Sequence, residues 1–201
     1  TPAAANSLGA NKAIALDTVL PTVTNITSST TNGMYGIGQS ISIQVSFSKS
    51  VTVTGTPQLT LETGASDATV NYASGSGSNT LTFTYTVASS HTSPDLDYQS
   101  TSALTLNGET IKESVNNNAT LTLAAPATAN SLGANKAIVI NTTTPTVSFS
   151  APTSSASETT TTVTIPAVLS SVSALSVTID YTLTGGTATG SGTDYTFTNG
   201  T

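Results

Sequence analysis

The sequence predicts an all-β protein made of tandem antiparallel β-sandwiches. Apolar and polar residues alternate with a period of two in many short runs of the 201-residue chain, and no window shows a convincing helical stripe. Thr and Ser make up about a third of the residues, and β-branched Thr suits a pleated, half-exposed surface. Hydrophobic residues still reach 36%, more than a disordered Ser/Thr linker would carry.

The alternation places the strands of a central domain in order along residues 20–141. The runs that share an apolar residue at every second position are 41–47, 51–53, 59–61, 70–72, 81–87, 104–106, 121–123 and 138–140, with one more apolar position at Ile111. Turn signals such as Asn32-Gly33 and Asn107-Gly108 separate these runs. We therefore expect about seven or more antiparallel strands in this domain.

An internal repeat indicates how the chain is divided. Residues 6–14 recur unchanged at residues 130–138, an offset of 124 from position 6 to position 130, which is close to the length of one whole β-sandwich domain. The second copy leads into a closing strand and a polar linker that ends at Pro145. We predict that residues 1–19 are the last strand and linker of a preceding repeat, that residues 20–143 form one sandwich, and that residues 144–201 begin another.

Charge and composition argue against several classes of function. The chain has four Lys, no Arg and a net charge of −6, so it lacks the clustered cations that bind nucleic acid or an anionic membrane. It has no Cys, which excludes disulfides and thiolate metal sites. No apolar run approaches the roughly 20 residues that span a bilayer.

The central domain resembles a known family. The segments that carry the likeness are Gly38–Lys49, Val51–Gly64, Tyr72–Gly77, Leu81–Val87, Asp95–Tyr98 and Ser131–Ile138. Together they are similar to the bacterial Ig-like repeat of very long secreted or surface-anchored proteins, over the whole of residues 20–141. The resemblance implies an Ig-like sandwich that serves in the stalk of an adhesin, outside the cell or on its surface, in a family where several modules bear Ca²⁺.

Residues 146–201 resemble a second family. The segments Thr146–Ser150, Ser155–Glu158, Val177–Tyr181 and Gly186–Thr196 are similar to the first half of a Calx-β domain, another Ca²⁺-associated sandwich. The resemblance implies that Glu158 and Asp194 match that family's acidic pattern. Its later strands and its acidic loop would follow residue 201.

The few carboxylates of the chain include a candidate Ca²⁺ site. Asp95 and Asp97 project on the same side of an extended segment, and Glu62 and Asp17 offer further oxygens. Ca²⁺ takes six to eight oxygen ligands, which acidic loops at a domain junction can supply. The alternative is that these are solubilising loop acids, with Asp97 capping a turn. The candidate metal ligands are Asp95, Asp97, Glu62, Asp17, Glu158 and Asp194.

The sequence does not favour catalysis. His91 lies near Asp95, but no Gly-x-Ser-x-Gly elbow stands between a strand and a helix. Glu62, Glu109 and Glu113 could form a glycosidase pair, but such enzymes usually carry aromatic sugar platforms and this chain has no Trp. We expect no catalytic residues and no organic cofactor.

These observations favour a structural stalk module of a bacterial extracellular repeat protein, stiffened by Ca²⁺. Its partners would be neighbouring repeats or fibre subunits, together with a surface or glycan target. Two alternatives stay open. One is a filament subunit that exchanges strands through residues 1–19 or through the C-terminal half. The other is a glycan- or ice-binding module that uses hydroxyl ladders such as Thr52–Thr54 and Thr82–Thr86.

Overall fold

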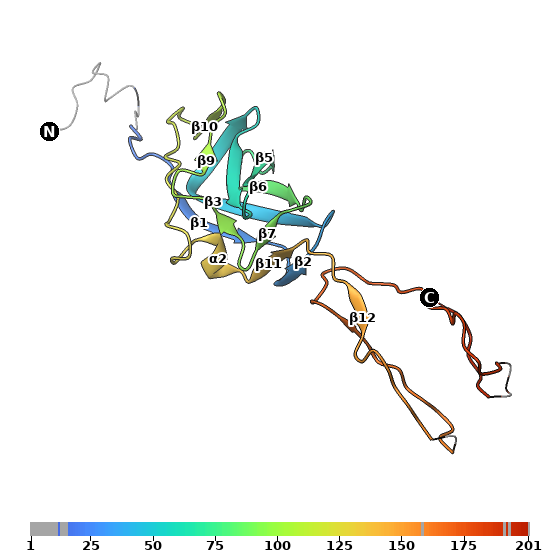
Figure 1. The fold of residues 1–201 in the computed structure, drawn as a ribbon. Helices are drawn as coiled ribbons and strands as arrows, with labels where there is room; N and C mark the ends of the chain where they lie inside the picture. The colour runs from blue at the N-terminus through green and yellow to red at the C-terminus, as the bar shows by residue number, and fades with distance from the viewer. Residues whose placement is uncertain (1–11, 13–15, 158, 191, 193, 201) are drawn as a thin grey trace.

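The computed structural model describes residues 12, 16–157, 159–190, 192 and 194–200, and it has an all-β, sandwich-like fold (Figure 1). Between residues 23 and 141 the elements are β1 (Val23–Ser28), β2 (Gly33–Tyr35), β3 (Ser40–Thr54), β4 (Gln58–Glu62), β5 (Ala68–Ser74), β6 (Ser78–Thr86), β7 (Thr92–Ser93), β8 (Asp97–Tyr98), β9 (Leu104–Thr105), β10 (Thr110–Lys112), α2 (Leu132–Asn135) and β11 (Ile138–Asn141). Two further strands follow, β12 (Val147–Phe149) and β13 (Ala167–Leu169). The predicted fold class is confirmed.

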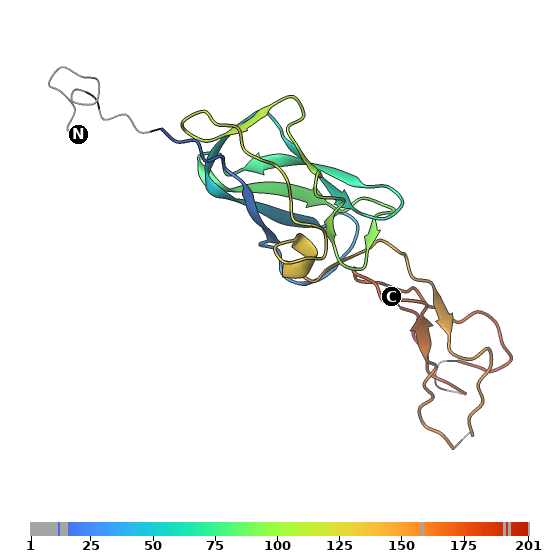
Figure 2. The same ribbon diagram turned by 90° about the vertical axis from the view of Figure 1, so that its left-hand side faces the viewer.

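Two sheets form the sandwich of residues 23–141. The larger sheet has the order β1-β3-β6-β5-β4-β8, with β10 added to β3 and β9 added to β4. The 15-residue strand β3 pairs with β6, with β1 along its first half and with β10 near its end, and its register shifts between Ser46 and Val51. Such an irregularity bends a strand, and the sheet curls around the core (Figure 2).

The smaller sheet, β2-β11-β7, contains a pairing that the sequence analysis did not expect. β11 runs antiparallel to β7 but parallel to β2, with Ile138 opposite Gly33 and Ile140 opposite Tyr35. A parallel pair needs a long connection between its strands, and here nearly the whole sandwich lies between β2 and β11. The sandwich is therefore closed by joining its last strand to one of its first.

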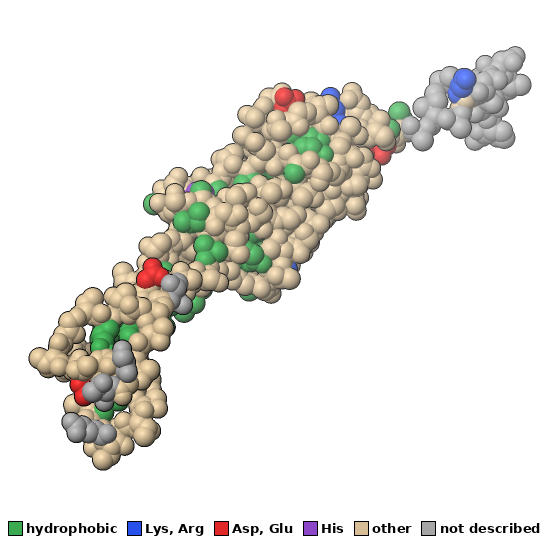
Figure 3. Space-filling view, turned by 90° about the vertical axis from the view of Figure 1, so that its right-hand side faces the viewer, with side chains coloured by type: hydrophobic (Ala, Val, Ile, Leu, Met, Phe, Trp, Pro, Cys, Tyr) green, Lys and Arg blue, Asp and Glu red, His purple; other side chains and the backbone are tan. Residues whose placement is uncertain are grey.

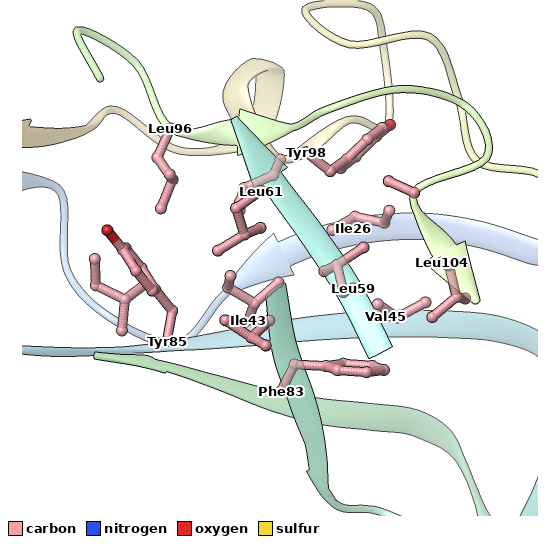
Figure 4. Close-up of a cluster of buried hydrophobic side chains, with 14 of the residues drawn as sticks. Ile26, Ile43, Val45, Leu59, Leu61, Phe83, Tyr85, Leu96, Tyr98 and Leu104 are labelled. Atoms are coloured by element: carbon pink, nitrogen blue, oxygen red, sulfur yellow. The ribbon is translucent and has the colours of Figure 1, made fainter. Parts of the chain in front are cut away.

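The period-two pattern sets which side chains enter the core. In β3 the residues Ile41, Ile43 and Val45 are fully buried, while the Ser and Gln residues between them lie on the outer face. Figure 4 shows the side chains that meet them from other elements: Ile26, Leu59, Leu61, Phe83, Tyr85, Leu96, Tyr98 and Leu104. One continuous hydrophobic core therefore joins both sheets.

Two local expectations were wrong. The alternation at residues 121–123 predicts a strand, but these residues pair with no strand, and the neighbouring Thr120 forms an isolated bridge with Thr22. Leu123 is buried, and its N–H donates to the Thr101 carbonyl at 2.9 Å. The pattern thus reports burial rather than strand pairing. The sequence analysis also missed α2, which has only four residues and no helical stripe.

The repeated segment at residues 130–138 closes the sandwich. The buried Ser131 side chain accepts a hydrogen bond from Ala134 N and caps α2, and Leu132 enters the core. Asn130 has a φ of 72°, and its carbonyl accepts the Ile26 N–H. Asn135 Nδ2 donates to the Ile26 carbonyl at 2.7 Å. Asn130, Ser131, Leu132 and Asn135 of this copy therefore each have a packing or bonding role in the closure.

Residues 146–200 are packed less closely than the sandwich. β12 pairs with β13, an isolated bridge joins Tyr181 to Gly200, and no described residue of this part is buried. Large apolar side chains are exposed, among them Phe149 at 69% and Val172 at 70%. The structure of this part thus leaves an apolar surface in contact with solvent.

Replacing Leu132 by Ala tests the closing role of the repeated segment. Leu132 is fully buried, so the variant should lose about 2–5 kcal/mol of unfolding free energy, measured by denaturant titration. Val115→Ala is the control, because Val115 is 56% exposed and its truncation should change the stability by no more than about 0.5 kcal/mol. Equal effects of the two substitutions would contradict this role.

Candidate functional site

The structure brings two of the predicted metal ligands together beside α2. Asp95 is exposed and Asp97 is buried, on either side of Leu96, whose N–H donates to the Ile138 carbonyl at 2.8 Å. A Cβ atom placed on Gly133 would lie 3.0 Å from Asp97 Oδ2 and 3.4 Å from Asp95 Oδ2. The two carboxylates thus converge on a glycine of the repeated segment, where a side chain would crowd them.

Asp97 holds the loop that leads to the repeated segment. Its Oδ1 accepts the Tyr98 N–H and its Oδ2 accepts the Ala127 N–H, each at 2.9 Å. Ala127 has a φ of 60°, a conformation that costs a non-glycine residue energy. The Tyr98 hydroxyl donates to the Ala124 carbonyl in the same loop at 2.7 Å. Burial, with a smaller contribution from the Asp97 charge, raises the pKa of Tyr98 to about 12.

Glu62 lies on the strand next to Asp97, directly opposite it in the β4–β8 register. Its side chain is exposed, and its Oε1 accepts the Gly64 N–H at 3.2 Å. Both Asp97 oxygens already accept N–H groups, so a Ca²⁺ ion here would need Asp95, main-chain carbonyls and water for most of its six to eight oxygens. Among the described residues, no group of three or more His, Asp or Glu side chains is arranged to hold a metal.

The other predicted ligands lie elsewhere. Asp194 Oδ2 accepts the Thr189 N–H at 2.6 Å within the C-terminal part, and Glu158 falls outside the described residues. Asp17 is in the segment that enters the sandwich, where its two oxygens lie 2.9 and 2.8 Å from Lys49 Nζ. The structure thus places Asp17 in an ion pair and not beside Asp95 and Asp97.

Lys49 is the centre of a polar cluster that we call the linker clasp: Asp17, Lys49, Glu113 and Asn117. Lys49 Nζ lies 2.9 Å from Glu113 Oε2 and also donates to the Val19 carbonyl. Asn117 Nδ2 donates to Glu113 Oε1 and to the Asp17 carbonyl. The Glu113 side chain is 5% exposed, so the ammonium of Lys49 compensates a buried charge.

The sequence pattern does not predict that Lys49, Glu113 and Asn117 form a group. They stand on different segments, in β3 and around the end of β10, and no local pattern connects them. The one available signal was the small number of Lys residues. The chain has ten carboxylates for four cations, so each Lys can be expected to pair with a carboxylate.

The entry segment, residues 17–22, is bound along its length. Thr22 and Ser48 exchange two hydrogen bonds, from Thr22 N to Ser48 Oγ at 3.0 Å and from Ser48 N to the Thr22 carbonyl at 2.8 Å. On its other side, Thr120 N donates to the Pro21 carbonyl at 2.8 Å. The segment therefore lies between β3 and residues 117–120.

The exit segment, residues 141–145, makes neutral contacts. The Thr142 hydroxyl donates to the His91 carbonyl at 2.9 Å, and Asn141 Nδ2 donates to the Val172 carbonyl at 3.3 Å. A cavity of about 270 Å³ is lined by Gly36, Ile37, the exit segment and residues 173–177. The exit segment thus joins the sandwich to the C-terminal part through hydrogen bonds between uncharged groups.

His91 and the hydroxyl ladders occupy the outer surface. The His91 ring stacks on Tyr85, with 2.9 Å between His91 Nδ1 and the Tyr85 hydroxyl, beside an open groove that Asp67 and Asn71 also line. On the face formed by β3 and β6, Ser40 stands opposite Thr86, with their hydroxyl oxygens 3.3 Å apart. Figure 3 shows few charged side chains on the surface that it presents.

The three glutamates weighed as a glycosidase pair have separate surroundings. Glu62 lies opposite Asp97, Glu113 belongs to the linker clasp, and the Glu109 side chain lies over Gly55, where a Cβ atom would overlap it. Each has a contact that accounts for its position in the fold.

Comparisons with protein-family models, with curated proteins and with solved structures found no match to this chain. The helix α2 has four residues, and the described part of the chain contains no helix with the length and apolar character needed to span a membrane.

The variant Asp97→Asn tests whether Asp97 is needed without any metal. Asparagine has one acceptor oxygen, so its amide would leave the N–H of either Tyr98 or Ala127 without its partner. We expect a loss of about 1–3 kcal/mol in unfolding free energy in excess EDTA. Exposed Asp95→Asn is the matched control and should stay within about 0.5 kcal/mol. Wild-type stability for Asp97→Asn in EDTA would contradict the structural role.

The linker clasp should make stability depend on pH. Hydrogen bonds from Lys49 and from the Val19 N–H lower the pKa of Asp17 below its ordinary 3.8, so its contribution is present above pH 3.8 and is lost as pH falls through the lowered value. Asp17, and then Glu113, raise the pKa of Lys49 above 10.5, so that contribution is present below pH 10.5 and is lost as pH rises through the raised value.

The pH dependence can be measured against Asp17→Asn. The difference in melting temperature between wild type and this variant should be constant at neutral pH, should shrink as pH falls below 3.8 and should disappear below the lowered pKa of Asp17, because protonated Asp17 resembles the amide. A difference that stays the same at pH 2.5 and pH 7 would show that the Asp17 charge does not contribute.

Proposed function

We propose that the chain is a non-catalytic stalk module of a bacterial extracellular or cell-surface repeat protein, of the adhesin type, and that it acts as a spacer. The observation that carries this proposal is the arrangement of the entry and exit segments. They leave the sandwich at opposite ends, and each is bound to it by several contacts (Figures 1 and 2). A module with this geometry fixes the orientation of the preceding module relative to the following one.

The contacts at both ends restrict bending. At the entry the ion pair of Asp17 and Lys49 acts together with main-chain hydrogen bonds, and at the exit Thr142 and Asn141 bond to the sandwich and to the C-terminal part. Pro21 and Pro145 have a fixed φ, which further reduces the number of linker conformations. At both ends, these contacts therefore favour a defined angle between the sandwich and its neighbour over free rotation about the linker.

Calcium would add to this stiffness if it binds at Asp95 and Asp97. These carboxylates flank the repeated segment, so an ion there would hold α2 and the closing strand in place. A ligand that binds only the folded state raises its melting temperature. Melting in EDTA and in millimolar Ca²⁺, with Asp95 and Asp97 both changed to Asn as the control, measures this contribution directly.

A filament subunit is the second candidate. The exposed apolar side chains of residues 147–197, such as Phe149 and Val172, form a surface that strands of another copy could cover. In that case the protein would assemble, and the exposed apolar side chains of the C-terminal part would be buried in the assembly.

Light scattering coupled to size exclusion separates the two functions. For a spacer we expect one monomeric mass of 20.0 kDa over a wide range of concentration, because no contact between copies is needed. X-ray scattering should then give an elongated particle whose dimensions do not change with concentration. A mass that rises with concentration, and that Phe149→Ser returns to the monomer value, would favour strand exchange instead.

A further inference from the structure

We propose that the entry face, formed by Ser48, Lys49, Glu113, Asn117 and Thr120, is a docking site for an extended linker that carries an acidic residue, and that this acid decides whether a linker docks. The proposal rests on the proposed spacer function and specifies which linker the module accepts. In this chain the linker is the entry segment, and the acid is Asp17.

The ammonium of Lys49 supplies the chemical basis for this selection. It has three N–H donors and three acceptor groups around it: the Glu113 carboxylate, the Asp17 carboxylate and the Val19 carbonyl. Two of the three belong to the entry segment. Without that segment, Glu113 alone among these acceptors would remain, so docking of an acidic linker completes the hydrogen bonding of Lys49.

The remaining contacts of the entry face do not distinguish one linker sequence from another. Asn117 donates to the Asp17 carbonyl, Thr120 N donates to the Pro21 carbonyl, and Ser48 bonds to the main chain of Thr22. Any extended segment could make these bonds. The contact between the Asp17 side chain and Lys49 therefore determines specificity.

The entry segment and the exit segment differ at the position that contacts Lys49 in the entry segment. The repeat aligns Asp17 with Asn141, while Thr18 matches Thr142 and Pro21 matches Pro145. Asn141 has no charge, and it bonds instead to Thr143 N and to the Val172 carbonyl. Residues 137–201 contain no Lys or Arg, so these residues offer no ammonium to this linker. The entry junction should be sensitive to salt, and the exit junction should not.

A spin label at one position in the full chain tests this difference. The chain has no Cys, so Thr18→Cys and, separately, Thr144→Cys each give one labelling site on an exposed linker residue. The label at position 18 should be immobilised in the parent chain. It should become mobile when Asp17 is changed to Asn, when Lys49 is changed to Met, or in about 1 M salt, where the Debye length is roughly 3 Å. The label at position 144 should not respond to any of these changes.

The controls separate docking from folding and from the spacer function. Asp17→Glu keeps the acid and should retain more immobilisation than Asp17→Asn, and circular dichroism must show that each variant is folded. An immobile label at position 18 in both Asp17→Asn and Lys49→Met would overturn the docking proposal. A concentration-dependent mass would overturn the spacer function instead, whatever the label shows.

Discussion

The register of β3 is the constraint on which the rest of the structure depends. This strand pairs with β1, β6 and β10, so its alternation decides which face of the larger sheet is apolar. A shift by one residue would move Ile41, Ile43 and Val45 to solvent and bring the intervening polar residues into the core. The shift between Ser46 and Val51 lets one strand serve two partners in succession. The curl of the larger sheet follows from this arrangement.

Closure has a different physical basis, because it depends on polar groups. The repeated segment supplies a capping hydroxyl at Ser131 and an amide at Asn135, and Asp97 fixes the loop before it. Ser131 and Asp97 are buried, where an unpaired donor or acceptor costs far more than at the surface. The apolar core therefore drives collapse, while this small set of hydrogen bonds fixes how the last strand returns to β2.

The low charge of the chain gives individual ionic contacts a larger part in its organisation. The chain has only four cationic and ten acidic side chains, so each ion pair has few charged neighbours that could compete with it. Asp17 and Asp97 are both aspartates of this small set, yet one binds an ammonium at the entry and the other binds main-chain N–H groups beside the core. An aspartate thus holds the linker where its neighbour is an ammonium group, and it stabilises the fold where its neighbours are main-chain N–H groups.

The sequence by itself determined the fold class, the central strands from β3 to β6 and the closing strand, because period-two burial is a local property that a single chain displays. Its spacing also predicted that the Asp95 and Asp97 carboxylates lie close together, as they do beside Gly133. It did not determine the absence of a strand at residues 121–123, the parallel pairing of β11 or the meeting of Asp17, Lys49 and Glu113. Those depend on which segments become neighbours across a hundred residues of chain, and that is decided by the tertiary packing of the whole sandwich.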